Sequence, residues 1–440
     1  MVLFVLGFLL QLCTATGSRP TQSLRANISS LFKQNPGSQT ETLKLTGHIF
    51  KESIPLLSSR DDVFRHSRMS SDYQHDVVFV IKQKNMDELT TFLHDVSDPS
   101  SINYGRHMTR KAVAEMTANP EARAAVLTYL RQNGASVIAE TLSSEYITSR
   151  APVGVWERVF NCKFFLFHFS QADGEVTKVV RTESYSIPTA LEHHVESVFN
   201  TVQMPHQPMN GFMTKVEGTE SIDGKERLQS TDKYITPALL RTAYNIGTKQ
   251  GSTLSSQCVY ATGNQNFSPT DLVKFQSFFQ LPSQPVATIT GGHASSAVCD
   301  ATPDLCGEAN LDVQYLMAMS PVSPTTFWYS EYNGFSGWLV TIANLEKPPL
   351  VFSISYGIDE KLVPASEFTA FNTQAIKLGA IGVSIIAASG DDGAISRKVR
   401  QTPSACFYAP NFPASNPYVT AVGATSVRTI SSFFNFQRFL

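Results

Sequence analysis

Hydrophobic and polar positions follow a clear period only from about residue 76 onward. Residues 18–70 are polar and show no persistent period, so we expect an irregular segment there. The run VVFVIKQ at 77–83 is rich in β-branched residues and predicts a strand. A helix should follow, because Leu89, Phe92, Leu93 and Val96 form an i, i+3, i+4, i+7 stripe that ends before Pro99. Asn85 and Glu88 stand where a capping box would begin this helix.

A second helix is expected from Asn119-Pro120 to Asn133-Gly134, since proline favours the first helical position and glycine follows helix ends. The segments 137–152 and 163–182 supply further strands. Strands and helices thus alternate across residues 71–204, which indicates a small α+β domain. Residues 205–233 are polar, contain glycine and lack an apolar period, so they read as a linker before a second domain at 234–440.

Two nearly continuous apolar runs in the second domain, at 350–357 and 382–390, end in glycine. They flank a helix expected at 366–378. Strands that are apolar throughout and joined by a helix are typical of a buried parallel sheet, so the fold class is α/β. Functional groups in such sheets gather at the carboxyl ends of the strands.

Composition limits the classes of function. Of 440 residues, 42% are hydrophobic and 16% charged, and the formal net charge is −2, which suits a globular protein with a large core. No basic patch with interleaved aromatic residues occurs, so we expect no nucleic-acid partner. No G-x-G-x-x-G motif follows either apolar strand, which sets a dinucleotide-binding fold aside.

The N-terminus carries a short apolar run followed by small residues near position 17. This pattern favours a cleaved secretory signal over residues 1–17, although basic residues are missing ahead of the run. A signal anchor is the competing interpretation, but the run is shorter than the ~20 residues that a membrane span needs. No later segment is apolar enough to cross a membrane.

A secretory route makes disulfides and glycans possible. Cys299 and Cys306 bracket the segment DATPDL and could close a small loop in an oxidising compartment. Their spacing does not fit a zinc site, and an odd number of cysteines remains after the signal. Glycosylation sequons occur at Asn27 and Asn266, and Pro269 makes the second the weaker candidate.

Two acids in the segment CGEANLDVQYLM, Glu308 and Asp312, stand four residues apart among apolar neighbours. On a helix they share one face, where like charges repel, so a plain surface pair is one interpretation and a functional pair the other. Asp391 follows the strand at 382–390 through a glycine. It is either a functional acid or an ordinary turn aspartate whose side chain bonds its own backbone. If all three acids meet in one cleft, repulsion would keep a proton on the pair and raise a pKa, as general-base chemistry requires.

These residues carry a family resemblance. GEANLDVQYLM resembles the Glu-x-x-x-Asp helix of the sedolisin family of serine-carboxyl peptidases, and ASGDDGA resembles its Ser-Gly-Asp-Ser-Gly turn. The segment DELTTFLHDVSDPSSINYGRHMT is similar to the family's propeptide. The resemblance implies a subtilisin-like parallel sheet with flanking helices behind an α+β propeptide domain. It also implies that Glu308 is the general base, that Asp312 orients it, and that Asp391 stabilises the oxyanion. Asp392 stands where the family usually has serine.

The nucleophilic serine of the family has no counterpart in these 440 residues. Ser426, in GATS, resembles an earlier structural turn of the family, so we expect a C-terminally truncated peptidase domain. The calcium that the family binds would take its ligands from residues beyond Leu440, and no metal ligand is assignable here.

The leading hypothesis is a secreted or lysosomal precursor of an acid-acting peptidase that releases peptides from protein N-termini. Its partners would be polypeptide substrates and its own propeptide, acting as an intramolecular inhibitor and chaperone until the linker at 205–233 is cut. The alternative is a catalytically inactive sedolisin-like protein that binds or inhibits peptides, since an acyl-enzyme needs a nucleophile. An aspartic peptidase is a weaker alternative, because the two Asp-Thr/Ser-Gly turns are missing.

Overall fold

A computed structural model describes residues 47–55, 57, 60, 62–170, 176–205, 235–330, 334–391, 410–426 and 437–438. The predicted signal segment, the linker at 205–233 beyond its first residue, Asn27 and Asp392 lie outside these described residues. We call residues 47–205 the N-terminal domain and residues 235–438 the C-terminal domain.

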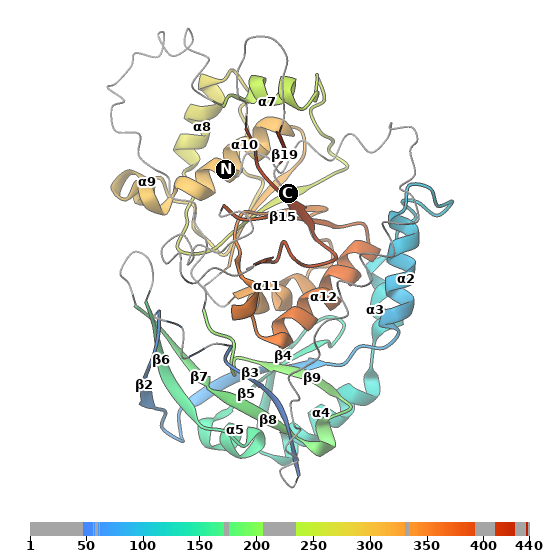
Figure 1. Ribbon diagram of the computed structural model, residues 1–440, viewed down its shortest axis with the longest axis vertical. Coiled ribbons are helices and arrows are strands. Elements are labelled where there is room, and N and C mark those ends of the chain that lie inside the picture. Colours follow the sequence, from blue (N-terminus) through green and yellow to red (C-terminus); the bar gives the residue numbers. More distant parts are fainter. Residues whose placement is uncertain are drawn as a thin grey trace.

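The N-terminal domain consists of antiparallel sheets and short helices (Figure 1). A four-stranded sheet has the order β4-β5-β3-β9, a three-stranded sheet the order β2-β6-β7, and β1 pairs with β8. The strands are β1 (His48–Ser53), β2 (Val63–Arg68), β3 (Gln74–Ile81), β4 (Ser136–Glu140), β5 (Tyr146–Pro152), β6 (Phe164–Ser170), β7 (Val176–Thr182), β8 (Ser184–Pro188) and β9 (Val195–Phe199). The helices are α2 (Met86–Ser97), α3 (Arg110–Thr117), α4 (Pro120–Gln132), α5 (Val153–Phe160) and the short η3 (Thr189–Leu191).

Both predicted helices of this domain are confirmed, and the cap predicted at Asn85 is wrong. Asn119 caps α4, because its Oδ1 accepts from the N–H of Ala122 at 3.2 Å. Asn85 makes no cap bond and adopts a left-handed backbone conformation with φ 54°. Its Nδ2 donates instead to the carbonyl of Met116 at 2.8 Å, so a contact with α3 replaces the local capping box.

The irregular segment predicted at 18–70 is also corrected, because β1 and β2 lie within it. Both strands take their partners from far along the chain: His48 pairs with Pro188, and Val63 with Phe169. Each ladder contains a bulge, which breaks the alternation of inward and outward side chains that a sequence pattern would reveal.

The C-terminal domain is built on a six-stranded sheet of order β11-β12-β10-β13-β15-β17, in which every pair is parallel. Its strands are β10 (Gln257–Ala261), β11 (Thr288–Thr290), β12 (Thr325–Tyr329), β13 (Val351–Ile354), β15 (Ser384–Ala388) and β17 (Thr420–Val422). Shorter pairs are β14 (Ile358–Asp359) with β16 (Asn411–Phe412) and β18 (Thr425–Ser426) with β19 (Gln437–Arg438). The helices are α7 (Pro237–Ala243), α8 (Pro269–Phe278), α9 (Ser296–Ala301), η5 (Pro303–Leu305), α10 (Gly307–Met319), α11 (Gly334–Ala343), η6 (Glu360–Leu362) and α12 (Ala365–Ala380).

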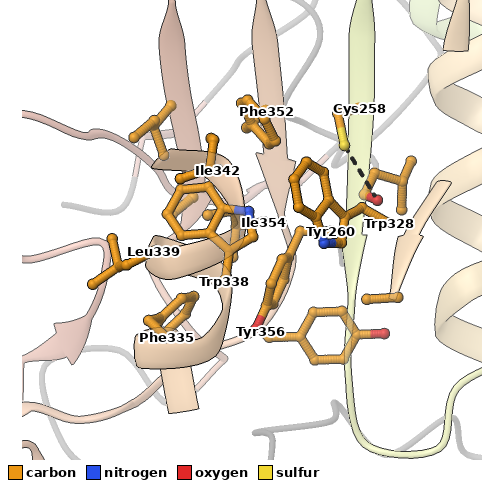
Figure 2. Packing of buried hydrophobic residues seen from close by; sticks show 14 of the residues in the cluster. Cys258, Tyr260, Trp328, Phe335, Trp338, Leu339, Ile342, Phe352, Ile354 and Tyr356 are labelled. Atoms are coloured by element: carbon orange, nitrogen blue, oxygen red, sulfur yellow. Dashed lines mark hydrogen bonds between the residues drawn. The ribbon is translucent and has the colours of Figure 1, made fainter. Parts of the chain in front are cut away.

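The predicted fold class is therefore confirmed: a parallel sheet flanked by helices follows an α+β domain. The expected strand–helix–strand passage is β13, α12 and β15, and β13 and β15 are neighbours in the sheet. An aromatic cluster fills the space between α11 and the sheet, with Trp338 against Phe352 at 5.5 Å and Tyr260 against Phe335 at 5.5 Å between ring centroids (Figure 2). This core fixes the strands whose carboxyl ends form the candidate site.

Helices α11 and α12 lie between the parallel sheet and the N-terminal domain (Figure 1). The two domains meet through buried polar contacts: Lys377 of α12 forms an ion pair with Glu145 at 3.0 Å, and Glu52 accepts from the N–H of Ser366 at 3.2 Å. In the part of the chain that the structure describes, no helix has both the length and the apolar character to span a membrane.

Candidate active site

Helix α10 carries the first two candidate residues, Glu308 and Asp312, on its first two turns. The helix packs against β10 and buries Ala309, Val313 and Leu316. Asp312 lies on the buried side, with 5% of its surface exposed, and Glu308 is partly buried. The acid pair is therefore not a plain surface pair on a solvated face, and its functional role stays a prediction.

Asp312 has a specific partner at the edge of the sheet. The hydroxyl of Ser355 donates to Asp312 Oδ1 at 2.9 Å, and Ser355 is the first residue after β13. The sequence analysis did not select Ser355. Its position directly after an apolar parallel strand was the available signal, because polar groups there face the functional end of the sheet.

Asp391 is the third residue after the neighbouring strand β15. It follows Gly390, whose φ of +96° is readily adopted only by glycine, so the chain turns sharply at this point. Asp391 is exposed, whereas Asp312 is buried. Its negative charge nevertheless acts on Glu308, so the structure brings Asp391 within electrostatic range of the pair on α10.

Burial and mutual repulsion shift the acids toward their protonated forms. Burial raises the pKa of Glu308 to about 7, and the charge of Asp391 adds to the rise. Burial also raises the pKa of Asp312 well above its ordinary value; the charge of Glu308 strengthens this shift and the Ser355 hydrogen bond opposes it. Both carboxyls of the pair therefore favour the protonated form.

Several buried polar atoms in this cluster lack a hydrogen-bond partner among the described residues. They are Glu308 Oε1, Asp312 Oδ2 and the hydroxyl of Tyr356. Tyr356 directly follows Ser355, and its own pKa is raised by burial and then by the charges of Glu308 and Asp312. Unpaired carboxyl oxygens in a buried site are available to hold or accept a proton, which is the chemistry expected of a general base.

The side chain of Asn411 lies close to both strand ends. A Cβ built on Gly357 would lie 1.8 Å from Asn411 Oδ1, and one built on Gly390 would lie 2.8 Å from Asn411 Nδ2. The carboxamide therefore sits between the loop that contains Tyr356 and the loop that contains Asp391. No local sequence pattern indicates this contact, because Asn411 reaches the site through the pairing of β16 with β14.

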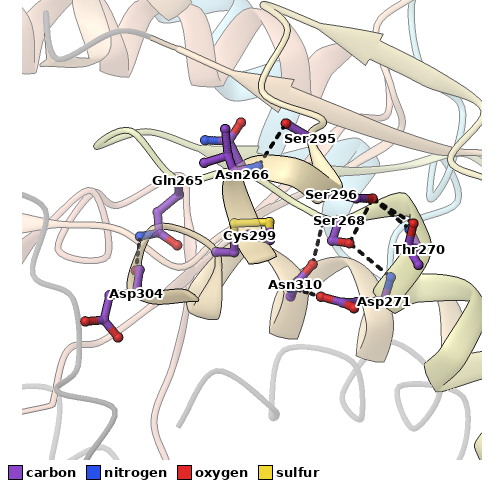
Figure 3. Close-up of a disulfide and its surroundings, with 12 residues drawn as sticks. Gln265, Asn266, Ser268, Thr270, Asp271, Ser295, Ser296, Cys299, Asp304 and Asn310 are labelled. Atoms are coloured by element: carbon purple, nitrogen blue, oxygen red, sulfur yellow. Dashed lines mark hydrogen bonds between the residues drawn. A yellow bond between two sulfur atoms is a disulfide. The ribbon is translucent and has the colours of Figure 1, made fainter. Parts of the chain in front are cut away.

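The predicted disulfide between Cys299 and Cys306 is present, and Cys306 directly precedes α10 (Figure 3). The second sequon does not fit its surroundings. Asn266 has 8% of its surface exposed, and its Nδ2 donates to the carbonyl of Asn264 at 2.9 Å. A buried, hydrogen-bonded amide cannot carry a glycan without unfolding of this loop.

Within the described residues, no group of three or more His, Cys, Asp or Glu side chains is arranged to hold a metal ion. No step of the chemistry considered below passes through a metal.

An α+β domain placed before a parallel α/β domain with a buried acid pair is the arrangement that the family resemblance implies. Comparisons with known proteins agree with this resemblance. Residues 62–204 match the family described as pro-kumamolisin, activation domain. The chain is 29% identical over 382 residues to mouse tripeptidyl-peptidase 1 and 28% identical over 379 residues to the human protein.

Each of these alignments covers 82% of this chain and 63% of the relative, so the chain spans less than two thirds of the relatives' length. Among solved structures, a Pseudomonas sedolisin, a serine-carboxyl proteinase complexed with two molecules of pseudo-iodotyrostatin, is 21% identical with a TM-score of 0.37. That similarity covers 44% of this chain and 55% of the other. The activation-domain match and the tripeptidyl-peptidase 1 relatives confirm the resemblance to the sedolisin family.

Proposed function

We propose that this chain is the precursor form of an acid-acting serine-carboxyl peptidase that releases short peptides from the N-termini of polypeptides. The observation that carries the proposal is the buried pair Glu308–Asp312, with a raised pKa at both carboxyls and Asp391 within electrostatic range. An acid cluster of this kind at the carboxyl ends of parallel strands is suited to proton transfer. The activation-domain match and the tripeptidyl-peptidase 1 relatives supply the reaction class.

In the proposed mechanism Glu308 is the general base and Asp391 stabilises the oxyanion. A serine hydroxyl, which we assign to no residue of the 440, attacks the carbonyl carbon of the scissile bond, and its proton passes to the Glu308 carboxylate. The electron pair of the carbonyl moves onto oxygen, where a protonated Asp391 donates a hydrogen bond. Glu308 then returns the proton to the leaving amine as the bond breaks, which leaves an acyl-enzyme that water hydrolyses.

The proposed role of Glu308 has a consequence for the pH dependence of the rate. Glu308 must be ionised to accept the serine proton, and its pKa of about 7 places that ionisation near neutrality. The rate should therefore fall with decreasing pH along a limb that reports Glu308. Activity at acid pH and a location in an acidic compartment of the secretory route, such as the lysosome, are proposed from the family resemblance and not from this limb.

The N-terminal domain would act as the propeptide. It is anchored on α12 by the buried pair Glu145–Lys377 and by Glu52 at the first turn of that helix. These contacts support a role as an intramolecular chaperone and inhibitor, which ends when the segment at 205–233 is cleaved. Calcium, which the family resemblance implies, is assigned to no residue here.

The experiment compares the full-length protein with its Glu308→Gln variant on a tripeptide amide substrate between pH 3 and 7. Loss of a general base should lower kcat by about 10²–10⁴-fold while folding is retained. Glu346→Gln, at an exposed glutamate, is the matched control and should keep wild-type turnover. Wild-type rates in Glu308→Gln would overturn the assignment. Binding of a peptide aldehyde without any turnover would favour the inactive peptide-binding alternative.

A further inference from the structure

Helix α10, which carries the acid pair, begins without a cap of its own. The first turn of any helix leaves backbone N–H groups without partners inside the helix. The residue before α10 is Cys306, and its side chain makes no capping bond, since it is engaged in the disulfide. Helices α4 and α8 differ, because Asn119 and Ser268 cap them from the preceding position.

Gln265 supplies the missing cap from another part of the chain. Its Oε1 accepts from the N–H of Glu308 at 3.2 Å, and its Nε2 donates to the carbonyl of Asp304 at 3.1 Å. Figure 3 shows Gln265 directed at Asp304, beside the disulfide. Only 3% of Gln265 is exposed, so the Gln265 side chain is itself buried, whereas its partner Asp304 is an exposed residue. The Gln265 carboxamide thus links the first turn of α10 to the loop that precedes this helix.

The backbone around Gln265 is shaped to aim this side chain inward. It follows Gly263 and Asn264, with φ of +69° and +59°, which reverse the chain just after β10. The next residue fixes the same loop, because the N–H of Asn266 donates to the carbonyl of Leu305 at 2.7 Å. The disulfide closes the loop from its other end. Hydrogen bonds from the loop that follows β10 therefore hold the first turn of α10 and the segment before it in place.

We propose that Gln265 is a positioning residue for Glu308: it caps α10 from outside the helix and so sets where the Glu308 carboxylate stands relative to Ser355 and Asp391. This inference rests on the proposed function for its catalytic consequence. Within the described residues, the Gln265 side chain bonds only backbone atoms, so it acts through Glu308 and would touch neither substrate nor reacting atoms. Misplacement of a catalytic group by about 1 Å can cost about 10²-fold in rate.

The test uses Gln265→Met in the full-length protein, because methionine keeps the shape and removes both hydrogen bonds. We expect kcat on a tripeptide amide to fall about tenfold or more, with KM within about twofold of wild type. The limb of the pH profile that reports Glu308 should also move. The matched control is Asn119→Leu, because Asn119 caps α4 with the same geometry: Oδ1 accepts at 3.2 Å, and Nδ2 donates to the carbonyl of Lys82 at 2.9 Å.

A second readout does not need catalysis. Amide hydrogen exchange at Glu308 should be about fivefold to tenfold faster in Gln265→Met than in wild type, since a cap contributes about 1 kcal/mol. If the wild type has no peptidase activity, the proposed function fails, and faster exchange still supports the capping role. Unchanged exchange at Glu308 would overturn the inference, as would an equal loss of kcat in Asn119→Leu.

Discussion

Glu308→Gln should change how the stability of the chain depends on pH. The wild-type carboxyl has a pKa of about 7 in the folded protein, against an ordinary value of 4.5. Between these values the folded state binds more protons than the unfolded state, so unfolding becomes easier as the pH rises. Glutamine keeps the size of the side chain and removes the ionisation, so this part of the pH dependence should disappear.

The size of the effect follows from the shift. At 1.36 kcal/mol per pKa unit, a rise from 4.5 to about 7 corresponds to about 3 kcal/mol of destabilisation at pH 7.5. Below pH 4 Glu308 is protonated in both the folded and the unfolded state, so its contribution to the pH dependence of the unfolding free energy vanishes. For a domain of this size, 1 kcal/mol moves the Tm by about 2–4 °C, so the variant should melt about 6–12 °C above wild type at pH 7.5.

Calorimetric scans of both proteins from pH 4.0 to 7.5 measure this difference, with Glu346→Gln as the exposed control. Asp312 should leave a residual slope in the variant, because burial raises its pKa independently of Glu308. Parallel Tm curves for wild type and Glu308→Gln across the whole range would refute the reasoning, since they would mean that Glu308 is ionised normally in the folded chain.

Two other changes test the frame of the site and the contact between the domains. Gly357→Ala should destabilise the chain by about 1–3 kcal/mol in thermal unfolding, because the added Cβ would overlap Asn411. The control is Gly337→Ala, whose added Cβ meets nothing within 4 Å and should not destabilise the chain. Equal Tm values for the two variants would contradict the close packing of Asn411 against Gly357. Glu145→Gln should cost about 3 kcal/mol in chemical denaturation because it strands a buried Lys377. Adding Lys377→Met should restore most of that loss; an undiminished loss would show that the ion pair is not its source.

The elements that could be predicted from sequence are those whose signal is local. The continuous apolar runs predicted β13 and β15, and local patterns predicted the helices α2, α4 and α12. The pairing of Cys299 with Cys306 followed from a short loop between them. Glu308 and Asp312 stood out because two acids interrupt an apolar helix face.

The features that escaped prediction depend on partners distant in sequence. Strands β1 and β2 are polar along most of their length and owe their form to β8 and β6. Asn85 is a residue type that often caps helices, but its side-chain amide donates instead to the carbonyl of Met116 on another helix. Gln265 and Asn411 act on the site through loops that only the folded sheet brings together. The burial of Asn266 could likewise not be read from its sequon.

The central claim is that Glu308 holds a proton because it is buried beside other acids. A ¹³C NMR titration of the glutamate side chains, in wild type and in Asp391→Asn, measures this directly. We predict that Glu308 titrates near pH 7, well above its ordinary 4.5, and that its midpoint falls when Asp391 loses its charge. A Glu308 midpoint near 4.5 that does not respond to Asp391→Asn would contradict the account.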